Sequence, residues 1–176
     1  MPPNTLEKSN QARVEPATLE DLPQLAQMAM DLFQMEGDFE PSYEKQERGL
    51  KLILEEPNRG RIFVLRNDDV IIGMVNILFT ISTAEGAMVL ILEDFFVHPS
   101  HRGQGYGTKL LNAVREFAVS KDFKRITLLT DKISEESQRF FAKNEFVFSK
   151  MIPMRLHLDP NTREAPRDEQ NQVAAE

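Results

Sequence analysis

The sequence predicts an α/β (α+β) fold: a single domain with a mixed central sheet flanked by about four helices. Three observations favour this class. Apolar runs with strand spacing alternate with stretches of helical spacing along most of the chain. A long apolar run at residues 89–97 leads into a glycine-rich loop, which is followed by an amphipathic stretch. The length of 176 residues suits one hydrophobic core.

The first elements are a short strand at residues 12–16 and then a helix. Thr18 is a good N-cap, and Asp21 follows it by three positions. We expect Gly37 to end this helix. One face of the helix is apolar and consists of Leu22, Leu25, Ala26, Ala29 and Phe33.

A second helix and a hairpin follow. The helix is expected to run from a cap at Ser42 to Leu54, closed by Pro57. Two strands at residues 61–66 and 70–79 are joined by an Asn-Asp-Asp turn, which predicts a hairpin.

The second half of the chain alternates strands and helices. Each element is bounded by turn residues or by a cap. In order they are a turn at 83–86, a strand at 89–97, a helix ending near Lys121, a buried strand at 126–130, a helix at 134–144 capped by Ser134, and late strands at Val147 and 151–157.

Composition bounds the class of protein. Hydrophobic residues are 41% and charged residues 28% of the chain, as in ordinary globular proteins. No apolar run approaches the roughly 18 residues of a membrane span. The net charge of −7 argues against a nucleic-acid binder. The absence of cysteine excludes disulfides, thiolate metal sites and a cysteine nucleophile. We therefore expect a cytoplasmic protein without nucleic-acid or membrane partners.

The loop after the long strand contains three glycines in five residues: Gly103, Gly105 and Gly107. Glycine costs roughly 0.5–1 kcal/mol relative to alanine in ordered structure, so a simple turn does not explain the cluster. A helix N-terminus behind such a loop presents unpaired N–H groups and a positive dipole end, which suits a phosphate. The Walker and G-x-G-x-x-G patterns both fail, because Thr108 precedes Lys109 and stands where the second pattern needs glycine.

The pattern that fits is R-x-x-G-x-G, read as Arg102, Gly105 and Gly107, after the string E-D-F-F-V at residues 93–97. This combination resembles the acetyl-coenzyme A signature of the GCN5-related N-acetyltransferase (GNAT) superfamily. The order of the expected elements resembles that fold as well, from residue 13 to residue 158. The resemblance implies a sheet splayed around acetyl-CoA, with the pyrophosphate held by backbone amides of the loop.

The resemblance also implies which residues bind the coenzyme. Strand residues pair through their backbone with the pantetheine arm, loop residues surround the phosphates, and two positions of the last helix match the family pattern. They are Phe95, Phe96, Val97, Arg102, Gly103, Gln104, Gly105, Tyr106, Gly107, Thr108, Phe140 and Lys143. Core packing is the alternative role for the three strand residues. No metal is expected, since no cysteine or carboxylate set stands at ligand spacing near the loop histidines.

Two adjacent acids, Glu93 and Asp94, lie inside the apolar strand, where charges are costly unless they are paired. Because strand side chains alternate, we expect Glu93 on the face of Phe95 and Val97, and Asp94 on the opposite face with Phe96. That placement excludes a shared-proton pair. The alternative to catalysis is a structural ion pair with Arg or Lys.

Acetyl transfer needs a neutral amine, and an alkyl amine with a pKa near 10.4 is neutral in about one molecule in 2,500 at pH 7. A carboxylate that takes the proton contributes a factor of about 10²–10⁴. We expect Glu93 to be this base, since the family often carries its glutamate on this strand, with Asp94 as a second candidate. The L-E-D-F-F-V string resembles the diamine and polyamine acetyltransferases. Glu36 and Asp38 then extend a negative surface for the amine, or else belong to an ordinary solvated loop.

The last helix departs from the family pattern. Ser134 stands where the family has asparagine, Glu145 where it has glycine, and Phe141 where it has the tyrosine that protonates the leaving thiolate. Phe141 cannot donate a proton. A thiol with a pKa near 8.5 leaves tolerably as a thiolate, so this change need not abolish catalysis.

The leading hypothesis is an acetyl-CoA-dependent N-acetyltransferase that acts on a small cationic amine by direct attack in a ternary complex. The alternatives are an acetyltransferase of protein lysines or α-amines, and a coenzyme A-binding regulatory module without turnover. We expect a flexible leader at residues 1–11, the catalytic domain at 12–158 and a disordered polar tail at 159–176. The segment from Met151 to Leu158 is a candidate edge for a homodimer.

Overall fold

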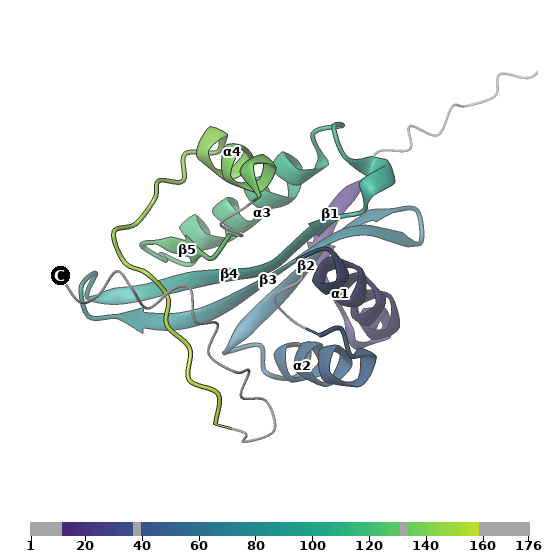
Figure 1. Ribbon diagram of the computed structural model, residues 1–176, viewed down its shortest axis with the longest axis horizontal. Coiled ribbons are helices and arrows are strands. Elements are labelled where there is room, and N and C mark those ends of the chain that lie inside the picture. Colours follow the sequence, from purple (N-terminus) through teal and green to yellow (C-terminus); the bar gives the residue numbers. More distant parts are fainter. Residues whose placement is uncertain (1–11, 37–39, 131–133, 159–176) are drawn as a thin grey trace, which may run out of the picture. The chain divides into compact units, whose positions relative to one another are not determined.

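Figure 1 shows the computed structural model of the protein, which describes residues 12–36, 40–130 and 134–158. The chain divides into two compact units, Met1–Phe140 and Phe141–Glu176. The first unit holds the sheet and the helices that cover it. Its elements are β1 (Arg13–Pro16), η1 (Leu19–Asp21), α1 (Leu22–Glu36), α2 (Tyr43–Glu55), β2 (Gly60–Asn67), β3 (Val70–Ser82), β4 (Ala87–Val97), η2 (Pro99–His101), α3 (Tyr106–Ser120), β5 (Ile126–Leu128) and most of α4 (Glu135–Lys143).

The sheet has five strands in the order β1-β2-β3-β4-β5. The first four pair antiparallel, whereas β5 pairs parallel to β4. The mixed sheet follows from the connections, because tight turns join β2 to β3 and β3 to β4, while α3 makes the long crossover that a parallel pair requires. Asp68 and Gly86 provide the left-handed backbone of the two turns, with φ of 53° and 60°. The predicted fold class is confirmed.

Helices cover both faces of this sheet (Figure 1): α1 and α2 lie against one face and α3 against the other. The α1 and α2 side is a mainly aliphatic cluster in which Leu25, Ala29 and Leu50 meet Met74 and the ring of Phe96. The α3 side is aromatic. The ring of Phe117 on α3 lies 5.5 Å from that of Phe63 and 5.9 Å from that of Phe79, centroid to centroid.

The corner before α1 has the predicted capping residues. The backbone N–H of Thr18 donates to Oδ2 of Asp21 at 2.9 Å, and the N–H of Asp21 donates to the carbonyl of Thr18 at 3.1 Å. Arg66 of β2 donates to Oδ1 of Asp21 at 2.8 Å and to Glu15 of β1 at 2.6 Å. Burial opposes ionisation of Asp21, but the Thr18 and Arg66 hydrogen bonds outweigh it and lower the pKa of this carboxyl. The ion pair therefore joins the start of α1 to two strands.

Replacement of Asp21 by Asn is expected to lower the free energy of unfolding by about 2 kcal/mol at pH 7, because a hydrogen-bonded buried charge is lost. The pKa of Asp21 is below its ordinary value of 3.8 in the folded state, so its contribution is complete above about pH 4 and lost as the pH falls further. Urea unfolding of both proteins from pH 7 to pH 3 measures this. A difference that stays constant down to pH 3 would contradict the ion-pair explanation.

The second helix has the predicted position but a different cap. The side chain of Ser42 makes no capping hydrogen bond. Its backbone N–H instead donates to Oε1 of Gln46 at 2.7 Å, so the glutamine one turn on caps the entry to the helix. The predicted end of the first helix, Gly37, lies outside the described residues. Ser134 does cap α4, since its Oγ accepts from the N–H of Ser137 at 3.3 Å.

Two strand predictions need correction. The strand predicted at 126–130 is shorter, ending at Leu128, and is not fully buried, because its outer edge has no neighbouring strand among the described residues. The late strands at Val147 and 151–157 do not form in the described part of the second unit. A single extended segment without a partner does not hold a strand conformation in water, and Pro153 removes one donor. The apolar side chains of this part of the chain are all at least 76% exposed. They are Val147, Phe148, Met151, Ile152, Met154, Leu156 and Leu158.

Candidate active site

The second half of β4 has an open edge. Its pairing with β5 ends at Leu92, opposite Leu128, whereas β4 itself continues for five residues to Val97. On its other edge β4 remains paired with β3 as far as Val97 and Gly73. Glu93, Phe96 and Val97 are thus paired with β3, and residues 93–97 face no strand of the described chain on the β5 side, which is the splay that the sequence predicted.

A β-bulge in β4 places both acids on one face of the sheet. The register with β3 shifts between Asn76, opposite Glu93, and Met74, opposite Phe96, so β4 has one extra residue there. That residue is Asp94, whose φ of 46° is left-handed. Asp94 and Glu93 both lie on the Asn76 face, and the prediction that they point to opposite faces is wrong. A bulge breaks the alternation on which that prediction rested.

The faces of the neighbouring residues follow from the same bulge. Phe96 lies on the Asp94 face, as predicted, and belongs to the core beside α1. Phe95 lies on the opposite face from Glu93, since its ring packs 5.5 Å from that of Phe140 on α4. Glu93 is therefore not on the side of Phe95 and Val97.

The two carboxyl groups differ in environment. Glu93 is exposed, whereas Asp94 is half-buried. Burial raises the pKa of Asp94 to about 6; the charge of Glu93 adds to the rise, and a hydrogen bond from Asn76 opposes it. This bond joins Nδ2 of Asn76 to Oδ2 of Asp94 at 2.5 Å. A carboxyl with a pKa near neutrality matches the requirement for a general base at physiological pH better than an ordinary one does.

Sequence reasoning missed Asn76. The side chain is 1% exposed and stands in the middle of the apolar strand β3. A polar residue at the centre of an apolar run was a signal that could have found it, because a buried amide requires a hydrogen-bond partner. Its position opposite the two acids could not be read from the chain, since that depends on the register of β3 against β4.

The glycine loop leads into the N-terminus of α3. Gly103 and Gly105 have left-handed φ values of 73° and 79°, and a Cβ at either position would meet nothing within 4 Å. The first hydrogen bond of the helix runs from the N–H of Lys109 to the carbonyl of Gly105 at 3.0 Å. The N–H groups of Tyr106, Gly107 and Thr108 precede it and have no intrahelical acceptor. The loop therefore has the open space and the donors that a pyrophosphate requires.

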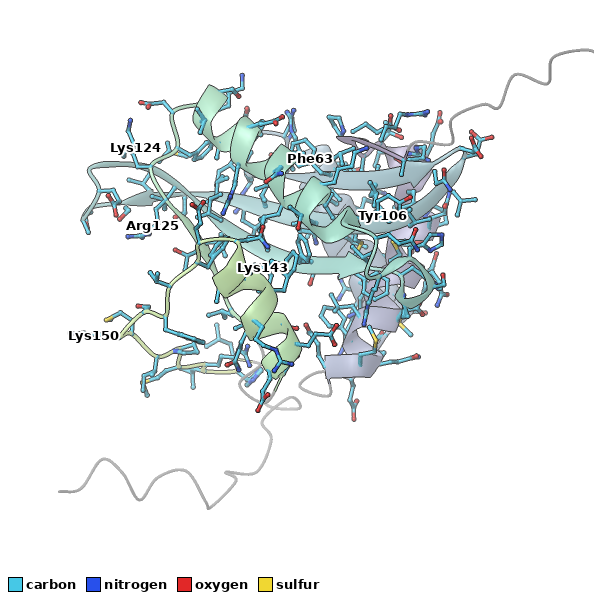
Figure 2. The ribbon with its side chains drawn as sticks, turned by 90° about the horizontal axis from the view of Figure 1, so that it is seen from above. Phe63, Tyr106, Lys124, Arg125, Lys143 and Lys150 are labelled. Atoms are coloured by element: carbon cyan, nitrogen blue, oxygen red, sulfur yellow. The ribbon has the colours of Figure 1, made fainter. Side chains whose placement is uncertain are left out.

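Tyr106 begins α3, as Figure 2 shows, and its ring lies 6.5 Å from that of His101. Gln104 is exposed in the loop. Glycine is needed at position 107 for a steric reason, because a Cβ there would come within 3.2 Å of the Phe140 ring. The absence of a side chain at Gly107 lets Phe140 pack onto the first turn of α3, so the predicted coenzyme residues Phe95, Gly107 and Phe140 lie together.

Arg102 has a structural contact that the sequence did not predict. Its Nε donates to the carbonyl oxygen of Val97 at 2.9 Å, and its guanidinium carbon lies 5.8 Å from the centre of the Phe96 ring. Arg102 thus ties the loop to the end of β4. The carbonyl of Val97 accepts this bond.

Three predicted residues lie elsewhere. Glu36 is the last residue of α1 and is exposed. Asp38 lies outside the described residues. Lys143 is an exposed residue in the last turn of α4 and belongs to the second unit, as does Phe141, whose ring is 5.6 Å from that of Phe146. Phe141 is buried, so an aromatic packing role accounts for the residue at the tyrosine position.

Neither a metal cluster nor a membrane span is found in the described part of the chain. His98 and His101 are linked through the hydroxyl of Ser100, at 2.7 Å and 2.9 Å, and do not belong to a group of three potential ligands among residues 12–36, 40–130 and 134–158. Over the same ranges, the helices are too short or too polar to cross a bilayer.

The sequence model of the acetyltransferase (GNAT) family matches residues 22–146, and the chain belongs to this family. The uncharacterized N-acetyltransferase YhfO of Bacillus subtilis (strain 168) is 28% identical over 91 residues. Those residues are 52% of this chain and 61% of the relative, so the match spans less than two thirds of that protein.

Solved structures share the fold. A predicted acetyltransferase with acetyl-CoA from Clostridium acetobutylicum has a TM-score of 0.70 at 19% identity, covering 84% of this chain and 97% of that one. An aminoglycoside acetyltransferase from an uncultured soil metagenomic sample has a TM-score of 0.70 at 21% identity, covering 86% and 99%. At these identities the likeness shows the fold.

Proposed function

We propose that the protein is an acetyl-CoA-dependent N-acetyltransferase that acetylates a primary amine, with a small cationic amine as the acceptor. The observation that carries this proposal is the bulge of β4, which presents Asp94 and Glu93 beside an open strand edge that ends in the glycine loop. The loop amides and the residues Phe95, Gly107 and Phe140 are proposed to hold the coenzyme. Arg102 is proposed to shape the loop.

The proposed reaction requires two proton movements from the amine. A carboxylate first takes one proton from the acceptor ammonium: an N–H bond breaks and an O–H bond forms on the acid. The nitrogen lone pair then forms a bond to the thioester carbonyl carbon. The C–S bond breaks with its electron pair on sulfur, and the nitrogen loses its second proton to water or to the thiolate. Asp94 has the pKa that suits the first step, and exposed Glu93 is placed to attract the cation.

The acidity of the site favours a cationic acceptor. Two acids share one face at the bulge, and the chain carries a net charge of −7. Glu36 and Asp38, at and just beyond the end of α1, are proposed to add to this negative field. An aminoglycoside is a polycationic amine, and one structure with this fold is described as an aminoglycoside acetyltransferase. A protein lysine or α-amine is the alternative acceptor.

A coenzyme A-binding module without turnover is the second candidate function. The observation that favours it is Phe141, a buried aromatic residue at the family's tyrosine position. Such a module predicts tight coenzyme binding without amine-dependent release of thiol. For both candidate functions, we propose that the exposed Lys143 contacts the coenzyme.

The deciding measurement is release of thiol from acetyl-CoA with a panel of diamines, aminoglycosides, neutral amines and lysine peptides. We expect release with the small dications.

Glu93→Gln is expected to raise KM for dications by about tenfold and to change kcat little, because an exposed charge attracts the cation without taking its proton. The protein has no cysteine, so it adds no background to a thiol reagent.

Other outcomes are equally informative. Turnover of peptides alone would move the acceptor to proteins. Silence across the panel, with coenzyme binding intact, would favour the non-catalytic module. If the wild-type protein does not bind acetyl-CoA, the proposed function is wrong. Binding is measured as stabilisation, because a ligand at 100 times its Kd should add about 2.7 kcal/mol to the free energy of unfolding.

Two further proposals concern the setting of the protein. The exposed apolar side chains between Met151 and Leu158 support a homodimer in which this segment meets the same segment of a second copy. The second proposal is a cytoplasmic location.

A further inference from the structure

Asn76 and Asp94 form a buried hydrogen-bonded pair on adjacent strands. Nδ2 of Asn76 lies 2.5 Å from Oδ2 of Asp94, and the asparagine is 1% exposed. The two residues meet because the bulge adds Asp94 to β4 at the point where Asn76 faces it from β3. We infer that Asn76 is a positioning residue that holds Asp94 in both of its protonation states, as a donor to the carboxylate and as an acceptor from the carboxylic acid.

The other atom of the amide supports this inference. Oδ1 of Asn76 is buried and has no hydrogen-bond partner among the described residues. A buried acceptor without a partner is costly and calls for a reason. Because nothing holds Oδ1 on its own side, the amide can turn over about its last torsion without losing a hydrogen bond to that oxygen. Turning brings Oδ1 to the position of Nδ2, facing Asp94.

An amide is suited to a partner that gains and loses a proton. It carries a donor and an acceptor on one planar fork, so half a turn exchanges them without moving the rest of the side chain. Lysine or arginine in place of Asn76 would serve only the charged form of Asp94.

The surroundings leave Asp94 dependent on this partner. Its proton affinity is set by burial, by the charge of Glu93 and by the Asn76 hydrogen bond, and only the last favours the carboxylate. β5 has no charged residue, and β3 presents the neutral Asn76. α1 and α3 pack against β4, and Phe140 of α4 packs on Phe95. The described charged groups on these helices, up to Phe140 on α4, are Asp31 and Glu36 on α1, Lys109, Arg115 and Glu116 on α3, and Glu135, Glu136 and Arg139 on α4.

The role in the reaction rests on the proposed function. When Asp94 takes a proton from the acceptor ammonium on Oδ2, the oxygen that faces Asn76, the new O–H meets the Nδ2 donor and their hydrogen bond is lost. Rotation of the amide lets the new O–H donate to Oδ1, so the acid stays in place. Release of that proton to water reverses the rotation. Asp94 itself has no partner among the ladder pairs of β3 and β4, because it is the bulged residue.

The test uses the wild-type protein and needs no turnover. The carboxyl carbon of Asp94 and the Nδ2 protons of Asn76 are followed by NMR from pH 4 to pH 9, and Asp94→Asn assigns the carboxyl signal. We expect both sets of resonances to titrate with one midpoint near pH 6. Titration of Asp94 with an unresponsive Asn76 amide would overturn the inference, because a fixed amide serves one protonation state only.

Asn76→Leu gives the second arm, since leucine has a similar volume and no hydrogen-bonding group. We expect the midpoint of Asp94 and the acidic limb of kcat/KM to move up by about one to two pH units together, as the carboxylate loses its hydrogen bond. Asn67→Leu is the matched control: its Oδ1 is also buried without a described partner, at the β2–β3 turn. This control should leave the Asp94 midpoint unchanged.

The outcomes separate the inference from the proposed function. If no amine is acetylated, the two titrations still decide whether Asn76 follows the proton. If amines are acetylated and the Asp94 midpoint is the same in Asn76→Leu as in the wild type, the function stands and the inference falls. Should Asn76→Leu fail to fold, the wild-type NMR titration decides alone. An equal shift in Asn67→Leu would also overturn the inference, because general destabilisation would then explain both variants.

Discussion

Asp94→Asn is expected to make the folded protein more stable above pH 6 and to reduce amine-dependent thiol release by about 10² or more. The two effects share one cause. Asp94 is half-buried, which raises its pKa to about 6 from an ordinary value of 3.8. The folded protein therefore disfavours the charged form of Asp94, although Asp94 must be charged to accept a proton from the amine. Asparagine removes both the cost and the proton acceptor.

The sign of the pH dependence follows from proton binding. Between about pH 4 and pH 6 the folded protein holds a proton at Asp94 that the unfolded chain has released, so stability falls as the pH rises through this window. Above pH 6 the penalty is complete, and a pKa difference of about two units amounts to at most about 3 kcal/mol. Asp94→Asn should match the wild type near pH 4 and exceed it by up to that amount at pH 8.

The backbone permits this substitution. Asp94 has a φ of 46°, and asparagine tolerates the left-handed region at least as well as aspartate does. The amide can also keep one hydrogen bond to Asn76. A loss of activity in this variant therefore reports the missing carboxylate rather than a rearranged bulge.

Urea unfolding at pH 4, 6 and 8, with turnover at pH 8, measures both effects. The control is Asp122→Asn, which makes the same change at another left-handed residue, with φ of 60° and an 84% exposed side chain in an ion pair with Lys124. We expect this control to change stability by less than about 0.5 kcal/mol and to leave turnover unchanged. An Asp94→Asn protein that is less stable than the wild type at pH 8, or fully active, would contradict the assignment of Asp94.

Local pattern was sufficient for most of the fold. The strands of the β2–β3 hairpin, the strand before the loop and the four α-helices of the described residues lie within a few residues of their predicted positions. The apolar spacing and the turn residues agree with the structure, whereas the Ser42 side chain does not cap α2 as predicted. The glycine loop was also predictable, because left-handed φ values at Gly103 and Gly105 are the reason that glycine is needed there.

What failed depends on neighbours that are distant in sequence. The bulge at Asp94 arises from the register of β4 against β3, and alternation along β4 alone gives the wrong face for Glu93. The Asn76–Asp94 bond joins residues 18 positions apart. The apolar alternation from Met151 to Leu158 satisfies the local pattern of a strand, but no partner strand lies beside it among the described residues of its own unit. Strand formation requires both the pattern and the partner.

The second large effect is expected at the glycine loop: Gly105→Ala should raise the Kd for acetyl-CoA by roughly 5- to 30-fold. Gly105 is the N-cap of α3, with a φ of 79°. An alanine there costs about 1–2 kcal/mol in the left-handed conformation. A Cβ would meet nothing within 4 Å, so the cost is conformational rather than steric. If the coenzyme needs this loop conformation, the penalty appears in the binding constant.

Gly86→Ala is the matched control for this prediction. Gly86 also has a left-handed φ, of 60°, and open space around the position of a Cβ, but it lies in the turn that precedes β4. The eleven residues of β4 separate that turn from the end of the strand where the loop begins, a distance of roughly 30 Å. We expect Gly86→Ala to lose thermal stability without losing affinity, and Gly105→Ala, whose loop can relax when the coenzyme is absent, to lose affinity in calorimetric titration. Equal affinity in the two variants would mean that the coenzyme does not bind on the left-handed form of this loop, and the phosphate site would have to lie elsewhere on the protein.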